Sequence, residues 1–165
     1  MRDRLQAEAT TLKASVRAQR VRNTIALFSP PPMPALSDIN FIEFAADAGS
    51  LGTLDALLQQ LGFRRVGQHR SKAVMLYRQG ELHLIVNAQP GSFTRRRFDA
   101  HGTSACALGI RIGDPLGAAA RATAMRSQRH DSPLGPDAVQ VPTIVAPDSN
   151  LAHFVCVVVW QQWPV

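Results

Sequence analysis

The feature that most constrains the fold of this chain is an order of predicted elements that occurs twice. Residues 39–47 (INFIEFAAD) have the aromatic and β-branched content of a buried strand. Residues 51–63 follow, with leucines at the spacings of three and four that indicate an amphipathic helix. Strands come next, and the same order begins again at residue 105. The chain therefore reads as an internal duplication of one supersecondary unit.

In the first half, Gly62 is expected to end the helix as a C-cap residue. Residues 72–79 and 81–88 are predicted to form two strands hinged at Gln79 and Gly80, which suits a β-hairpin. Residues 92–99 (SFTRRRFD) are predicted as a loop between the halves. The three arginines of this loop indicate a solvated or interdomain surface, with a phosphate site as the alternative.

In the second half, residues 105–114 are predicted as a strand on which Arg111 points away from its apolar neighbours. Asp114 as N-cap and Pro115 at the first helical position predict a helix over residues 115–128. Two strands should follow within residues 139–147 and 150–160. The halves are superposed by setting Phe44 on Ile110 and His83 on His153, at separations of 66 and 70 residues.

The formal net charge of +6 is concentrated near the N-terminus, where six Arg and Lys residues in the first 22 face only two acidic residues. We expect residues 1–23 to be a basic leader that is helical or disordered, and the proline-rich residues 24–37 to be a linker. The rest of the chain is close to neutral, so nucleic-acid binding is not expected. The sequence has neither an apolar run long enough to span a membrane nor a secretory signal, which favours a cytoplasmic protein.

Cys106 and Cys156 have apolar neighbours and do not form a C-x-x-C pair. We expect both to be buried free thiols rather than a disulfide. Motifs for a nucleotide-binding loop or a serine-nucleophile elbow are absent from the sequence.

Three stretches together resemble a known family. These are FIEFAAD before a leucine-rich helix, RQGELHLIVNAQP at the end of the first half, and HGTSACALGIRIGDP at the start of the second. They resemble the 4-hydroxyphenylpyruvate dioxygenase-like group of the vicinal oxygen chelate superfamily, and above all the C-terminal region of bacterial two-domain 3-dehydroshikimate dehydratases. The resemblance implies an α+β domain over residues 38–160, with two βαβββ modules (about 38–92 and 100–160) forming a curved mixed sheet around a cleft.

The resemblance also implies where a metal would bind, since ligands in metal-binding members come from the first and last strands of each module. The first-strand positions fall on Phe41 and Ala107, neither of which can bind a metal. The last-strand positions fall on His83 and His153. Two imidazoles are one ligand short of a usual catalytic site, so a hydrogen-bonded histidine is the favoured interpretation of each, with a divalent metal as the alternative.

Further cleft candidates are Glu43, the nearest third ligand, and Arg111, which either pairs with a carboxylate or covers the outer face. His101 is interpreted as structural, with Gly102 allowing a turn. The tail after Val155 departs from the continuation that the resemblance implies and suggests a truncated or altered C-terminus, with an apolar strand that favours a homodimer.

Three hypotheses for function remain open at this point. The first is a non-catalytic lobe or fragment of a larger 4-hydroxyphenylpyruvate dioxygenase-like or 3-dehydroshikimate dehydratase protein. The second is a metal-dependent lyase or dioxygenase that acts on an aromatic or α-keto acid, with His83 and His153 as ligands supported by Glu43. The third is a binding module, with the cleft holding a small hydrophobic anion or the basic leader holding nucleic acid. The sequence does not assign catalytic residues under any of the three.

Overall fold

The computed structural model describes residues 2–24, 28–131 and 140–156. The chain divides into two compact units, Met1–Pro30 and Pro31–Val165. The first unit contains the helix α1 (Arg2–Thr24), on which Leu5, Leu12 and Val16 are exposed. None of the helices that the structure describes is long and apolar enough to cross a membrane.

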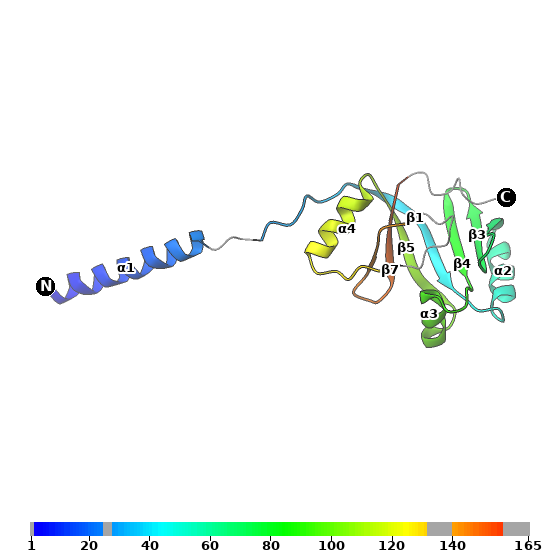
Figure 1. Ribbon diagram of the computed structural model, residues 1–165, viewed down its shortest axis with the longest axis horizontal. Coiled ribbons are helices and arrows are strands. Elements are labelled where there is room, and N and C mark those ends of the chain that lie inside the picture. The colour runs from blue at the N-terminus through cyan, green and yellow to red at the C-terminus, as the bar shows by residue number, and fades with distance from the viewer. Residues whose placement is uncertain (1, 25–27, 132–139, 157–165) are drawn as a thin grey trace. The chain divides into compact units, whose positions relative to one another are not determined.

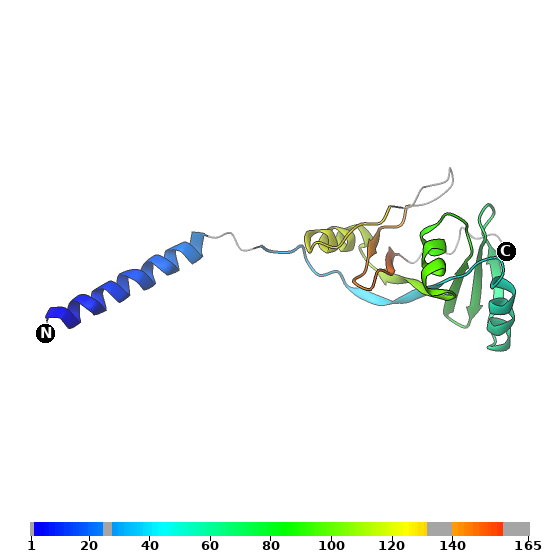
Figure 2. The same ribbon diagram turned by 90° about the horizontal axis from the view of Figure 1, so that it is seen from below.

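The second unit is built on one seven-stranded mixed sheet with the strand order β2-β3-β4-β1-β5-β7-β6 (Figures 1 and 2). The strands are β1 (Leu36–Ala45), β2 (Arg64–Gln68), β3 (Val74–Gln79), β4 (Leu82–Asn87), β5 (Ser104–Ile112), β6 (Thr143–Val145) and β7 (Leu151–Val155). The ladders β1–β4 and β5–β7 are parallel, and the other four ladders are antiparallel.

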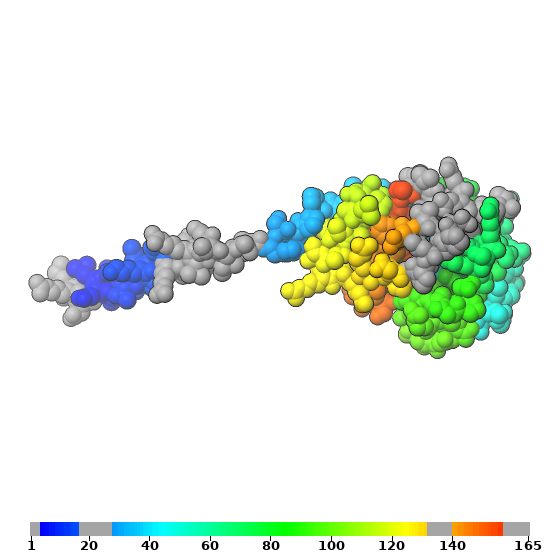
Figure 3. All heavy atoms as spheres, viewed as in Figure 1, coloured from blue at the N-terminus to red at the C-terminus, as the bar shows by residue number. Residues whose placement is uncertain are grey.

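The helices of this unit are α2 (Leu51–Gln60), α3 (Phe93–His101) and α4 (Pro115–Ala124). In the view of Figure 3, α4 and α3 contribute much of the visible surface. Asp114 caps α4 as expected, because its side chain accepts a hydrogen bond from the backbone N–H of Gly117 at 2.9 Å and Pro115 occupies the first turn.

The internal duplication is visible in the strand pairing. The second half pairs β5 with β7 and β7 with β6, as the first half pairs β1 with β4 and β4 with β3. The counterpart of β2 is reduced to a single bridge between Arg129 and Ile144 on β6. The backbone hydrogen bonds around it join His130 to Thr143 and Val145 to Gln128. The expected α+β fold of paired modules is thus confirmed, with a shortened second module in the described residues.

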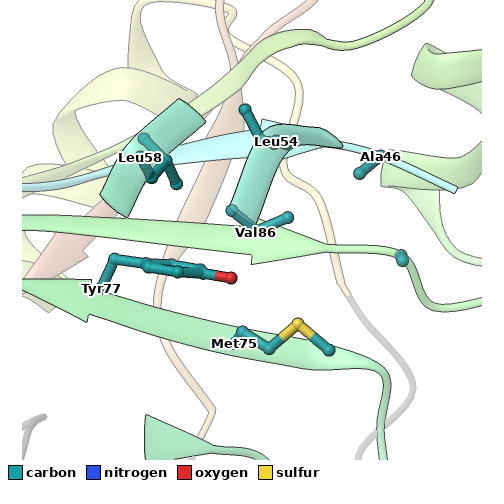
Figure 4. Packing of buried hydrophobic residues seen from close by; sticks show 7 residues of the cluster. Ala46, Leu54, Leu58, Met75, Tyr77 and Val86 are labelled. Carbon is teal, nitrogen blue, oxygen red and sulfur yellow. The ribbon is translucent and has the colours of Figure 1, made fainter. Parts of the chain in front are cut away.

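The two module helices pack against the same face of the sheet. Leu54 and Leu58 of α2 lie over Tyr77 and Val86 (Figure 4). Phe44 packs against the same cluster, which also contains Ala46, Met75 and Ala88. Near the other end of the sheet, a cluster of Ala118 and Ala119 from α4 meets Ile112 and Phe154. Since successive residues of a strand point to opposite faces, Phe41 and Glu43 of β1 lie on the face away from α2.

A third apolar cluster covers the face of the sheet opposite α2 and α4. Its buried members come from four strands, namely Phe41, Val74, Leu76, Ile85 and Val155. Val66 and Val141 pack against it. This face of the sheet is therefore largely apolar, and Glu43 and His153 lie on it as polar exceptions.

The expectation that residues 92–99 form a loop was wrong, because most of them belong to α3. Ser92 caps the helix by accepting a hydrogen bond from the backbone N–H of Arg95 at 3.0 Å. Gly102 ends it with φ = 68°, a conformation that favours glycine. The run of arginines suggested a solvated loop, yet arginine is a good helix former and only one side of this helix needs to face water.

Several boundaries also differ from those expected. β1 begins at Leu36, three residues before the predicted strand, and β2 was not identified as a strand from its residues. The strands predicted within residues 139–147 and 150–160 are observed as β6 and β7, which are shorter. The predicted altered C-terminus falls largely on residues 157–165, which lie outside the described residues.

Candidate functional site

A buried carboxylate lies near the middle of the sheet, on the face away from α2. Glu43 of β1 is 9% exposed. Its Oε1 atom accepts hydrogen bonds from Asn87 Nδ2 of β4 at 2.7 Å and from Thr94 Oγ1 of α3 at 3.1 Å. A polar group buried in this way is stable only if it has partners, and two neutral donors already satisfy one oxygen.

The other carboxylate oxygen faces His153 of β7. The distance from His153 Nε2 to Glu43 Oε2 is 3.7 Å, and the two side chains are only 16% and 12% exposed. The second ring nitrogen, Nδ1, lies 2.8 Å from the hydroxyl of Thr143 on β6. Glu43, Asn87, Thr94, Thr143 and His153 together are called the Glu43 cluster below.

The Glu43 cluster can span two modules because the strand between them carries small residues. In the ladders around β5, Ala107 pairs with Glu43 and Gly109 pairs with both Phe41 and His153. Methyl and hydrogen side chains leave room above β5 for the carboxylate and the imidazole to approach. The rings of Phe41 and His153 lie beside each other, with 5.8 Å between their centroids.

The charge of Glu43 is stabilised despite its burial. Burial by itself raises the pKa of a carboxyl group, because it removes water from the charged form. The hydrogen bond and charge of His153, together with the hydrogen bonds from Asn87 and Thr94, more than offset this effect and hold the pKa of Glu43 below its ordinary value. Glu43 is thus an anion in the folded protein at neutral pH.

His83 does not join the Glu43 cluster. It lies on β4 opposite Arg78 of β3, and burial lowers its pKa, with the charge of Arg78 acting in the same direction.

The strand register explains why His83 lies apart from His153, since Phe44 lies opposite Val86 and Ile110 lies opposite Phe154. If Phe44 is set on Ile110, His153 therefore corresponds to Ile85. The expected superposition of His83 on His153 is wrong by two residues.

Arg111 forms an ion pair with a different carboxylate from the one in the Glu43 cluster. Its Nη1 atom lies 3.2 Å from Asp38 Oδ2, and these residues pair across the β5–β1 ladder. The Arg111 side chain is 33% exposed. His101, the last residue of α3, is exposed. Of the four cleft candidates, the structure therefore brings Glu43 and His153 together and leaves His83 and Arg111 apart from them.

The donor set does not fit a catalytic metal ion. Among the side chains that the structure describes, there is no group of three or more His, Cys, Asp or Glu residues placed to hold one. Phe41 and Ala107, to which the resemblance assigns the two first-strand ligand positions, are both buried apolar residues. In the Glu43 cluster, a metal ion would have to compete with Asn87 and Thr94 for the carboxylate.

The two cysteines have different environments. Cys106 is fully buried and its thiol donates to the backbone carbonyl of Glu43 over 3.5 Å, whereas Cys156 is exposed, contrary to expectation. Burial and the nearby charge of Glu43 raise the pKa of the Cys106 thiol to about 12. Both cysteines are free thiols.

Three residues of the Glu43 cluster were not identified from the sequence: Asn87, Thr94 and Thr143. Asn87 ends β4 directly after the apolar residues 84–86, a position from which a polar side chain can face inward, and this was its only signal. Thr94 lies in the segment that was mistaken for a loop, and Thr143 lies in an apolar strand in which a threonine is ordinary.

Comparison with known proteins agrees with this fold. The chain is 44% identical to a 3-dehydroshikimate dehydratase of Pseudomonas putida over 129 residues, which cover 78% of this chain and 20% of that protein. It is 36% identical to a 4-hydroxyphenylpyruvate dioxygenase of Pseudomonas sp. over 109 residues, which cover 66% of this chain and 30% of that protein. The chain thus spans between a fifth and a third of the length of these relatives.

Solved structures show the same arrangement. A xylose isomerase-like TIM barrel/4-hydroxyphenylpyruvate dioxygenase fusion protein matches with a TM-score of 0.76 and 38% identity, over 91% of this chain and 25% of that chain. Methylmalonyl-CoA epimerase from Mycobacterium tuberculosis matches with a TM-score of 0.56 at 14% identity, over 79% and 91% of the respective chains, which is a likeness of fold alone.

The paired modules and these structural neighbours define a domain of the vicinal oxygen chelate class. Within that class, a family model described as hydroxyphenylpyruvate dioxygenase, HPPD, N-terminal matches residues 31–156. The chain belongs to this family.

Proposed function

We propose that this domain is a non-catalytic lobe of a larger 4-hydroxyphenylpyruvate dioxygenase-like or 3-dehydroshikimate dehydratase protein. The observation that carries the proposal is the identity of the residues at the metal-ligand positions. Phe41 and Ala107 are buried and apolar, and neither can donate to a cation. The nearby carboxylate of Glu43 is already held by Asn87, Thr94 and His153.

Metal titration tests this proposal directly. Untagged protein, purified without chelator, is analysed for bound elements and then titrated with Fe(II), Co(II) and Zn(II) in a calorimeter. We expect less than stoichiometric metal and no micromolar binding. Stoichiometric binding that disappears in Glu43→Gln and in His153→Ala, or in His83→Ala, but persists in His101→Ala, would overturn the proposal. His101 is the matched control because it is an exposed histidine outside the Glu43 cluster.

Turnover provides a second, independent test. The metal-dependent lyase or dioxygenase alternative requires that the chain convert 4-hydroxyphenylpyruvate or 3-dehydroshikimate when supplied with Fe(II) or another divalent metal. We expect no conversion above the rate of a buffer blank. Conversion that Glu43→Gln abolishes would make the domain an enzyme and would contradict the role of a lobe.

A small-molecule binding module is the second candidate function, and one cluster favours it. The Arg96 guanidinium lies 5.9 Å from the centroid of the Phe93 ring, and His130 meets the same ring edge-on at 5.3 Å. A cation beside an aromatic ring can hold an aromatic or keto acid, through its carboxylate and its apolar part.

Titration with 4-hydroxyphenylpyruvate tests this second candidate. Saturable binding that Arg96→Ala weakens at least tenfold would support it. Arg95→Ala is the matched control, because Arg95 is the preceding residue of α3, pairs with Asp99 and lies over a different ring, that of Phe98, away from Phe93 and His130. Equal weakening by both variants, or no saturable binding, would count against it. A homodimer and a cytoplasmic location remain predictions, the first of which light scattering can test.

A further inference from the structure

The Glu43 cluster joins parts of the chain that are far apart in sequence. Glu43 and Asn87 belong to strands of the first module, and Thr94 belongs to α3, which connects the modules. Thr143 and His153 belong to β6 and β7, the two outer strands of the second module. One carboxylate therefore connects the first module, the connecting helix and the outer strands of the second module through side chains alone.

The hydrogen bonds of Thr143 indicate where the protons lie. Its hydroxyl donates to the backbone carbonyl of Val141 at 2.9 Å. A hydroxyl has one proton to donate, so Thr143 can only accept from His153. With the hydroxyl proton directed at Val141, the Nδ1 atom of His153, 2.8 Å away, is the donor of this pair and carries a proton. If His153 were neutral, its Nε2 atom would present a bare lone pair to the Glu43 carboxylate at 3.7 Å.

We infer that His153 carries protons on both ring nitrogens, and that its ion pair with Glu43 is an acid-sensitive clamp that holds β6 and β7 to the first module. In this arrangement each polar atom of the pair faces a complementary one. Nδ1–H points at Thr143, Nε2–H points at Glu43, and the second carboxylate oxygen accepts from Asn87 and Thr94.

Other ionisable groups around the pair fit this assignment. In the segment before β6, the pKa of His130 is lowered by burial first and then by the charges of His153 and Arg96. From β5, the Cys106 thiol faces Glu43 and remains neutral, with Arg97 of α3 nearby. A charged His153 adds to the effect of burial in making protonation of His130 unfavourable.

The direction of the pH dependence follows from Glu43. Its pKa is lowered in the folded protein, by His153, Asn87 and Thr94 acting against the effect of burial. A carboxyl group of this kind contributes stability that is fully present above its unfolded pKa, about 4.5, and is lost as pH falls through the lowered folded value. The clamp should therefore hold at neutral pH and open in acid.

Nitrogen-15 NMR of the histidine rings of the unmodified full chain tests the proton assignment. Near neutral pH, we expect both His153 nitrogens to show the shifts of protonated nitrogens. A neutral His153 with one bare nitrogen, at a pH where Glu43 is ionised, would overturn the inference. This measurement needs no variant, so it does not depend on whether a substituted protein folds.

Hydrogen exchange followed by mass spectrometry tests the clamp. In Glu43→Gln, we expect the amides of β6 and β7 to exchange on the order of 10- to 100-fold faster than in the unmodified protein, while β3 and β4 change little. In His153→Gln, the acid midpoint of unfolding should move to higher pH, because Glu43 has lost its cation.

His83→Gln is the matched control, since it removes a half-buried histidine outside the Glu43 cluster. It should change neither the exchange of β6 and β7 nor the acid midpoint. Uniform acceleration across all strands in Glu43→Gln, or an acid midpoint that His153→Gln leaves unmoved, would show that the pair is not a clamp.

Discussion

The ring of Phe41 occupies the space that a side chain at Gly109 would need. These residues pair across the β1–β5 ladder, and a methyl group at Gly109 would overlap several ring carbons of Phe41. The ring is buried, 7% exposed, and cannot move into solvent without losing its contacts. Gly109 is therefore required by close packing, because only a residue without Cβ fits beneath the ring.

Replacement of Gly109 by alanine should destabilise the domain by about 1–3 kcal/mol, because the added methyl group overpacks the core at Phe41. Urea unfolding followed by circular dichroism measures the change. Gly113→Ala is the control, since a methyl group there meets no atom within 4 Å. Its free energy of unfolding should stay within about 0.5 kcal/mol of the original. Equal effects of both substitutions would contradict the packing argument.

Tyr77 attaches α2 to the sheet through its hydroxyl, which donates to Asp55 Oδ1 at 2.6 Å. The Tyr77 side chain is fully buried. Tyr77→Phe keeps the ring and removes the hydrogen bond to a charged group, so we expect a loss of about 1.5–3 kcal/mol in the free energy of unfolding.

Gln59→Ala is the control for Tyr77→Phe, because Gln59 donates to the other oxygen of the same carboxylate from an exposed position. It should cost only a few tenths of a kcal/mol. If thermal unfolding shows that the two variants lose the same stability, the buried hydrogen bond of Tyr77 contributes no more than the exposed one of Gln59, which contradicts the prediction.

The two thiols should differ in reactivity. Cys156 is exposed, whereas Cys106 is buried and its pKa is raised to about 12 by burial and the nearby charge of Glu43. The thiolate is the reactive form, so a maleimide should label one thiol of the native protein quickly and the second only after unfolding. Peptide mass mapping should place the first label on Cys156. Rapid labelling of Cys106 in native protein would contradict its burial.

His130 should contribute to the pH dependence of stability at mildly acidic pH. Its pKa is lowered by burial, and further by the charges of His153 and Arg96. The unfolded chain therefore takes up this proton more readily, and the folded state loses stability as pH falls below the ordinary histidine value of about 6.5. His130→Gln should flatten the change in urea midpoint between pH values of about 7.5 and 5.5.

The exposed His101 provides the comparison for His130→Gln. The urea midpoint of His101→Gln should change with pH as that of the unmodified protein does over the same range. If His130→Gln does not alter the change of the urea midpoint with pH, the proton that destabilises the folded state is taken up by another group.

The sequence was informative wherever a local pattern decides the structure. The leucine spacing of α2, the Asp114 and Pro115 start of α4, and the Gln79–Gly80 hairpin all appear in the structure. Each of these depends on residues within one turn or one helix of each other, so the pattern alone was sufficient. Exposed polar segments were harder, since α3 and β2 carry arginines that suit a loop, a helix or an edge strand equally.

The candidate site was only partly accessible from the sequence for the same reason. Glu43 and His153 were identified singly, but their contact depends on the small side chains of β5 and on the register of two ladders. Registers are set by bulges and long-range pairing, and the β1–β5 ladder has three such irregularities. A count of residues along the chain therefore misplaced His83 by two positions.

The pairing of β1 with β5 affects how the protein folds. It joins residues far apart in sequence, such as Leu36 with Ile112 and Ala45 with Ser104, at the centre of the sheet. During synthesis, β1 emerges from the ribosome well before its partner and has one edge unprotected until β5 arrives. Folding should accordingly be slow, on the order of milliseconds to seconds, and nascent chains that stall before β5 should be the ones that aggregate.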